Sequence, residues 1–140
     1  MKRIITLLLC FIMLYMAGCS SYASHSFMSA QGDNITVKLK EDGGYSLVTG
    51  SPIQIYKDGS PIAYIKTEPI DNLNNYRMQT QMTNGTVGDF SYHKCTMNDD
   101  KEHWYIVKYS KTLLIVISPD SVTAEEVFGR LSFDDKLDLK

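Results

Sequence analysis

Two histidines and a cysteine are the side chains of this sequence best suited to bind a transition metal. His93, Cys95 and His103 are close along the chain, and imidazole and thiolate are common ligands of zinc and copper. Side chains alternate along a strand, and a turn over residues 98–101 pairs Cys95 with Trp104, which puts His103 on the opposite face. Because just two of the three candidate ligands share a face, we predict no metal site. We expect Cys95 to be a buried or half-buried free thiol.

The same cysteine is a candidate nucleophile. A catalytic cysteine needs a general base within hydrogen-bond reach and a third group that orients the base. His93 shares a face with Cys95 but is too far along a regular strand for a direct bond, and no glycine-rich elbow adjoins Cys95. We therefore predict no catalytic residue and no cofactor, and keep a small envelope enzyme using Cys95 and His93 as an alternative.

The acidic segment at residues 98–102 has carboxylates without the pattern of a calcium site. Calcium loops alternate their ligands and place a glycine at the sharp turn, and this segment does neither. We expect a solvated turn between two strands.

Five aromatic side chains form the candidate binding surface. Aromatic rings on the face of a sheet can stack on sugars or anchor a protein partner. The competing interpretation is that they line a half-buried sheet, where aromatic residues are favoured in any case. The five residues are Tyr56, Tyr64, Tyr92, Trp104 and Tyr105.

The beginning of the chain has the pattern of an export signal that ends at a cysteine. Lys2 and Arg3 precede a run of 13 mostly apolar residues from Ile4 to Met16. A membrane-spanning helix needs about 20 apolar residues, so this run is short for a span. Two small residues then precede Cys19, as a peptidase cleft requires of an extended substrate.

The segment Met16-Ala17-Gly18-Cys19 resembles the lipobox of bacterial lipoproteins, although Met16 stands where that family usually has leucine. The resemblance implies a thioether-linked diacylglycerol on Cys19 and cleavage of the peptide bond before it. Two or more acyl chains make a stable anchor, so the mature protein is expected on the extracytoplasmic side of the cell membrane. The competing interpretation is an ordinary secreted protein.

Composition narrows the classes of partner. Without Lys2 and Arg3 the mature chain has 12 basic and 16 acidic side chains, a net charge of −4. Nucleic-acid binding needs a basic surface, which this balance does not supply. The expected partners are the membrane, through the lipid anchor, and an envelope protein or glycan.

The chain divides into four segments. Residues 1–18 form the signal peptide, and residues 19–34 contain the lipidated cysteine and a serine-rich tether. Residues 35–133 form a single domain, large enough to bury a core without a disulfide. Residues 134–140 are a charged tail.

Alternation of apolar and polar residues predicts strands at Ile35–Leu39 and Tyr45–Val48, joined by a turn at residues 42–44. Asp58-Gly59 lies between two further alternating runs and favours a tight type I′ hairpin. Pro61 lacks a backbone N–H, so the second strand of this hairpin lies at an edge or starts irregularly.

The middle of the domain is ambiguous. Residues 71–82 fit a helix that Asp71 caps and Asn84-Gly85 ends. Met78, Thr80 and Met82 also fit the period of a strand. We favour the helix.

The last third of the chain predicts three strands and a helix. The strands are Phe90–Met97, Glu102–Tyr109 and Leu113–Ile117, the last apolar on both faces and therefore central. Thr123 and Glu126 fit a capping box.

In that helix, Val122 and Val127 occupy the positions of a hydrophobic staple. Val127 and Phe128 share a face that can pack on the sheet.

The predicted fold class is α+β, an antiparallel sheet of five to seven strands with a C-terminal helix packed on one face. The chain resembles small, mostly uncharacterised lipoproteins of Gram-positive bacteria through Ser51–Gly59 and Ala124–Phe133. More distantly it is similar to the PsbP-like α+β fold, over most of residues 35–133. These motifs are structural, so the resemblance implies a fold rather than an activity.

The predicted function is a membrane-anchored, non-enzymatic binding or interaction module. The alternatives are the small enzyme described above and an accessory subunit of an envelope complex.

Overall fold

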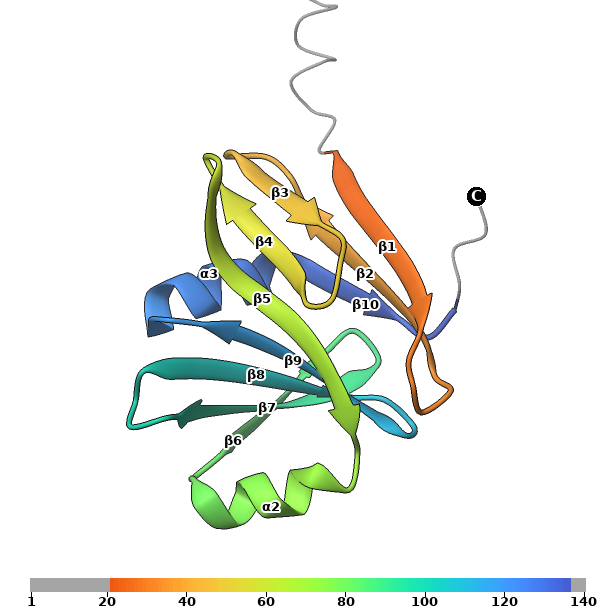
Figure 1. Ribbon diagram of the computed structural model, residues 1–140, viewed down its shortest axis with the longest axis vertical. Helices are drawn as coiled ribbons and strands as arrows, with labels where there is room; N and C mark the ends of the chain where they lie inside the picture. Colours follow the sequence, from red (N-terminus) through yellow and green to blue (C-terminus); the bar gives the residue numbers. More distant parts are fainter. Residues whose placement is uncertain (1–20, 137–140) are drawn as a thin grey trace, which may run out of the picture.

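The computed structural model describes residues 21–136. Over this range the chain forms ten strands and two helices, arranged as a seven-stranded and a three-stranded antiparallel sheet (Figure 1). The predicted α+β class with a C-terminal helix on one face of the sheet is confirmed. The second sheet was not predicted. The proposed signal peptide and Cys19 lie outside the described residues.

The large sheet has the strand order β3-β4-β5-β9-β8-β7-β6. Every residue of β9 is buried, as its apolar sequence on both faces predicts. The strand bounds are β3 Tyr45–Val48, β4 Ile53–Lys57, β5 Ser60–Pro69, β6 Thr83–Val87, β7 Phe90–Met97, β8 Glu102–Lys108 and β9 Thr112–Ser118.

The β4–β5 hairpin has the predicted turn. Asp58 and Gly59 both have positive φ, 50° and 80°, as a type I′ turn requires. β5 is not an edge strand, because β4 and β9 flank it. The irregular start is confirmed, since the register shifts between Ile55 and Tyr56, opposite Pro61.

Helix α2, Asn72–Gln79, confirms the helix predicted within residues 71–82. Its end was predicted wrongly. The backbone becomes extended at Thr80, and Asn84 and Gly85 pair with β7 as part of β6. Pairing with a neighbouring strand therefore outweighs the local tendency of Asn-Gly to end a helix.

Helix α3, Ser121–Arg130, starts before the predicted capping box. Asp120 is the N-cap, and its Oδ1 accepts the backbone N–H of Thr123 at 2.8 Å. The staple is also wrong, because Val122 is 65% exposed. Val127 and Phe128 are buried against the sheet, as predicted.

The small sheet consists of β1 (Tyr22–Met28), β2 (Asn34–Lys40) and β10 (Leu131–Asp134), with β2 in the middle. The predicted tether is wrong from Tyr22 onward, because β1 pairs with β2 along its whole length.

Serine enrichment hid β1, since Ala23 and Phe27 pack on the core while serines alternate with them. The predicted tail is wrong at Asp134, which pairs with Thr36 in β10.

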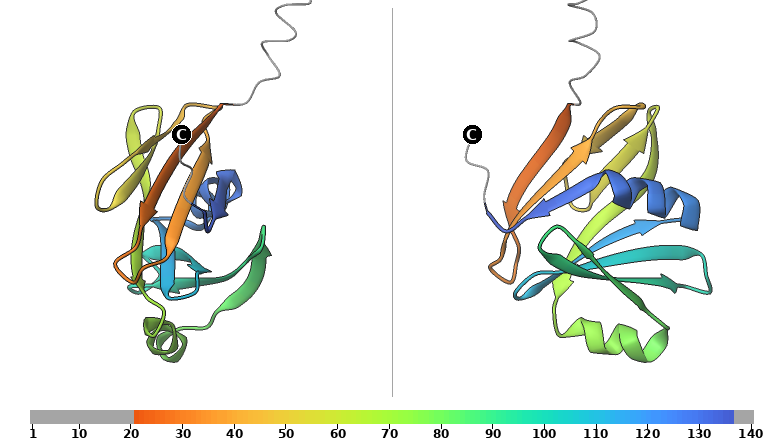
Figure 2. Two further views of the ribbon diagram at one scale, coloured as in Figure 1. Left: turned by 90° about the vertical axis from the view of Figure 1, so that its right-hand side faces the viewer. Right: turned by 180° about the vertical axis from the view of Figure 1, so that it is seen from behind.

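The two faces of the large sheet bury different clusters. One face packs on α3 and on the inward side of the small sheet, and its core includes Val37, Val127 and Phe128. The other face packs on α2 through Leu73, together with Cys95, Trp104 and Ile106. Figure 2 shows α3 and α2 at separate places on the sheet.

Candidate functional site

The register of β7 and β8 is the one predicted from the turn at residues 98–101. Cys95 pairs with Trp104 and His93 pairs with Ile106, whereas His103 pairs with Thr96. Because neighbouring residues of a strand face opposite sides, His103 faces away from His93 and Cys95. Within residues 21–136 no three His, Cys, Asp or Glu side chains are grouped closely enough to hold a metal ion.

Cys95 is a free cysteine, 5% exposed, in the core beneath α2. Burial raises the pKa of its thiol to about 11. A thiol with this pKa carries little thiolate at neutral pH, and thiolate is the reactive form. The surroundings of Cys95 are therefore those of a packing residue.

His93 joins three elements rather than activating a nucleophile. Its Nδ1 lies 2.5 Å from Asn84 Oδ1 on β6, and its Nε2 lies 3.5 Å from Arg77 Nη2 on α2. This geometry fits a neutral ring that donates from Nδ1 and accepts at Nε2. Burial, followed by the charges of Arg77 and Lys108, lowers the pKa of His93.

The five predicted aromatic residues do not form one exposed surface. Tyr92 and Tyr105 pack on Phe128 of α3, with Tyr105 and Phe128 stacked at 4.1 Å between ring centroids. Tyr92 also covers Gly85, where an added Cβ would come within 2.4 Å of its Cζ. These two tyrosines are therefore packing residues of the α3 face.

Trp104 belongs to the opposite face and is 5% exposed. The Tyr76 ring meets it edge-on at 5.2 Å, and Lys66 Nζ lies 4.6 Å from its ring centroid. Its indole N–H donates to Glu102 at 2.8 Å. With both faces of the ring occupied or buried, Trp104 offers little surface for stacking.

Tyr56 and Tyr64 are half-buried, as Tyr92 is. Tyr56 donates its hydroxyl hydrogen to Gln54 at 3.1 Å. Burial and, to a smaller extent, the negative charge of Glu102 raise the pKa of Tyr64. The positive charge of Lys66 acts in the opposite direction without cancelling them. Of the five, Tyr64 also lines a groove between β1 and β5 that the sequence did not reveal.

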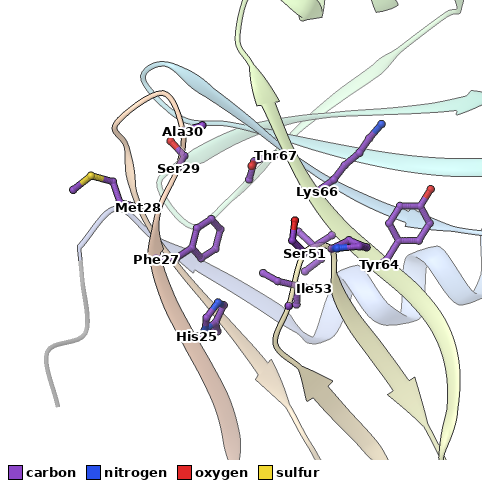
Figure 3. Close-up of a pocket in the computed structure, with 13 residues that line it drawn as sticks. His25, Phe27, Met28, Ser29, Ala30, Ser51, Ile53, Tyr64, Lys66 and Thr67 are labelled. Carbon is purple, nitrogen blue, oxygen red and sulfur yellow. The ribbon is translucent and has the colours of Figure 1, made fainter.

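That groove lies between β1, the β3–β4 loop and β5, and encloses about 480 Å³ (Figure 3). The rings of His25 and Phe27 stack on β1, with centroids 5.4 Å apart and planes inclined by 22°. Figure 3 shows Phe27 pointing across the groove toward Ser51 and Ile53. One wall is thus aromatic and the other is a loop of small residues.

The chemistry of the groove is largely uncharged. Hydroxyl groups of Ser29, Ser51 and Thr67 belong to its lining, and the lining contains no carboxylate. Lys66 also lines it, but its ammonium points to the far side of β5 (Figure 3), where it pairs with Glu68 Oε1 at 2.9 Å. The groove therefore suits an uncharged, partly apolar ligand.

Sequence reasoning missed the groove for a definite reason. Its lining comes from three segments, residues 25–30, 50–53 and 64–67. The first of them falls in the segment for which the serine-rich sequence predicts a tether. Alternation of Ala23, His25 and Phe27 was the available signal, and a single large apolar residue made that signal weak.

Comparison with models of protein families, with curated proteins and with solved structures finds no match to this chain. Neither helix within residues 21–136 has the length and apolar content needed to cross a bilayer.

Proposed function

We propose that this chain is a bacterial lipoprotein, lipidated at Cys19, that acts as a non-enzymatic binding module on the extracytoplasmic side of the cell membrane. The residues Met16–Cys19 and the apolar run before them support the anchor. The groove between β1 and β5 is the observation that carries the binding role.

The start of β1 supports a close approach of the domain to the membrane. Tyr22 follows Cys19 by three residues, which span at most roughly 10 Å. An acylated Cys19 would therefore hold the domain beside the bilayer instead of on a long tether. Tyr22 is 57% exposed, and tyrosine is favoured at the level of lipid head groups.

The same end of the domain carries the β2–β3 turn and the β4–β5 hairpin (Figure 1). Lys40, Glu41, Asp42, Lys57 and Asp58 lie there, and their charges nearly balance. Attachment through this end would thus depend on the acyl chains and not on anionic lipids.

An enzyme built on Cys95 and His93 receives less support, because both side chains are buried beneath α2 and each has a packing or linking role. The resemblance to small Gram-positive lipoproteins and to the PsbP-like fold stays a prediction.

The anchor is tested with Cys19→Ser in cells fed a labelled fatty acid. The wild-type chain should take up label and partition with membranes, whereas the variant should take up none and keep its leader. A variant that is still labelled and shortened would reject lipidation at Cys19.

The binding role is tested with a photo-crosslinking amino acid placed at Ser51, beside the groove, in intact cells. Ser91, an exposed residue of β7, is the matched control position outside the groove. We expect a discrete adduct from position 51 and none from position 91. No adduct from position 51, in cells where the anchored protein is present, would reject the groove as the binding site.

A further inference from the structure

β5 turns its backbone edge toward the groove. Four consecutive residues, Tyr64 to Thr67, line the groove, although consecutive side chains of a strand face opposite sides. β4 pairs with β5 as far as Ile65, opposite Ile53, whereas β9 continues to pair with β5 up to Pro69. Among the described strands, none occupies the β4 side of β5 over residues 66–69.

β1 presents a second edge to the same groove. It pairs with β2 on one side, and no described strand lies on its other side. Residues Tyr22–Met28 contain no Lys, Arg, Asp, Glu or Pro, which are residues that proteins use to block pairing at exposed edges. His25, Phe27 and Met28 line the groove, so the two strand edges face each other across it.

The directions of β1 and β5 suit one added strand. β1 and β5 run in the same general direction (Figures 1 and 2), so a strand antiparallel to β5, as β4 is, would also be antiparallel to β1. The hydrogen bond between Ser29 Oγ and Thr112 Oγ1, 2.7 Å long, joins the end of β1 to β9 and closes one end. An edge strand of a second copy would still be attached to its own sheet. Because β5 lies opposite β1, the groove does not leave space for that sheet.

We infer that the ligand of this groove, in the binding role proposed above, is an extended and uncharged segment of a partner protein. The segment lies beside residues 66–69 of β5, where β4 no longer pairs because it begins at Ile53, opposite Ile65. Its other edge faces β1. Four residues at about 3.3 Å each make a segment of roughly 13 Å.

Backbone hydrogen bonds supply the affinity of this mode of binding, and alternate side chains supply the specificity. Inward side chains of the segment meet Phe27 and Ile53, so alternate apolar residues fit. Outward side chains meet no carboxylate from the lining.

The test selects peptides from a random, phage-displayed library on the full-length chain in detergent micelles. Enriched peptides should carry apolar residues at alternate positions and should slow hydrogen exchange at those amides of residues 66–68 that do not already pair with β9. Methylating one peptide nitrogen that donates to β5 or β1 should weaken binding roughly tenfold, because one hydrogen bond is lost and its acceptor is left unpaired.

Two variants locate the binding. Ser51→Trp fills the groove from an exposed loop position and should abolish binding, whereas Ser91→Trp on β7 should leave it unchanged. The inference is overturned if no peptide is enriched, if enriched peptides bind Ser51→Trp equally, or if methylation has no effect. A peptide-free dimer that Ser51→Trp dissolves would assign the groove to a second copy and likewise reject the inference.

The outcomes separate this inference from the proposed function. A crosslinked adduct at position 51 that contains a glycan or small molecule, and no polypeptide, would reject strand addition and leave the binding module standing. The absence of any adduct would reject both.

Discussion

The two faces of the seven-stranded sheet are held by different forces. On the α3 face, aliphatic and aromatic side chains of α3 and the small sheet form a continuous core, with Tyr105 and Phe128 stacked at its centre. On the α2 face, Leu73 is the buried residue of the helix. Leu73 packs on a smaller buried cluster that includes Cys95 and Trp104, and polar pairs surround this contact. The α2 face therefore combines a hydrophobic cluster with polar contacts, whereas the α3 face is mainly hydrophobic.

The polar pairs of the α2 face converge on two side chains. The Glu68 carboxylate accepts hydrogen bonds from Tyr76 and Asn72 and pairs with Lys66. Burial raises the pKa of Glu68, but these partners outweigh it and the net shift is downward. His93 makes the second set of contacts, which connect α2 and β6 to β7. The difference teaches that stability should depend mainly on the α3 face and pH sensitivity on the α2 face.

The largest effect is expected from Phe128→Ala. Truncating a buried phenylalanine removes apolar contact and leaves a cavity, so the free energy of unfolding should fall by about 3–5 kcal/mol. Urea denaturation followed by the fluorescence of Trp104, the sole tryptophan, measures it. Val122→Ala on the exposed side of α3 is the control and should stay within about 0.5 kcal/mol of wild type. Equal losses for the two variants would contradict the prediction that stability depends mainly on the α3 face.

A smaller effect is expected from Leu73→Ala, about 2 kcal/mol, because α2 lies at the periphery and can settle into the space left. Hydrogen exchange should quicken in α2 and β6 before the rest of the sheet. A global loss as large as that of Phe128→Ala would show that both faces stabilise the fold equally.

The pH dependence should come from His93. Its pKa is lowered from 6.5 in the folded protein, so the unfolded chain binds the proton more readily and stability falls as pH decreases below about 6.5. Urea titrations between pH 7.5 and 5.5 should show this fall, and His93→Gln should flatten it.

The control for this experiment is His103→Gln, on the other face of β8, which should keep the slope. The range avoids Glu68, whose lowered pKa makes its contribution disappear below pH 4.5. A slope that survives His93→Gln would contradict the assignment.

The last prediction concerns the rate at which Cys95 is labelled, which reports how well α2 covers its face of the sheet. With a thiol pKa of about 11 and 5% exposure, native Cys95 should resist alkylation at pH 8 and react in urea, as mass spectrometry of its peptide would show. Leu73→Ala should quicken native labelling, since α2 covers the thiol. Labelling of the wild type at the rate of an unfolded peptide would mean that α2 does not protect this face.

Local patterns predicted the elements whose partners are neighbours in sequence. The turn at residues 98–101 set the register of Cys95 against Trp104, and Asp58-Gly59 set the β4–β5 hairpin. In each case the residues that decide the structure lie within a few positions of the strands they join.

Elements that depend on distant partners were missed. β10 pairs with β2 across more than ninety residues, and β1 has a sequence poor in large apolar residues. The candidate groove also depends on segments that are distant in sequence. Its open edge on β5 follows from the pairing of β5, which continues with β9 beyond the point where pairing with β4 stops. The aromatic residues misled for a related reason, since their composition does not tell which face of the sheet a helix will cover.

The central position of β2 in the small sheet has a consequence for the order in which the protein matures. Its two neighbours come from opposite extremities of the described chain, and Leu131 on β10 belongs to the core. Synthesis proceeds from the N-terminus, so this sheet cannot close until β10 has been made, and β1 and β2 lack their third strand up to that point. A chain truncated before Leu131 should accordingly stay susceptible to limited proteolysis throughout β1 and β2.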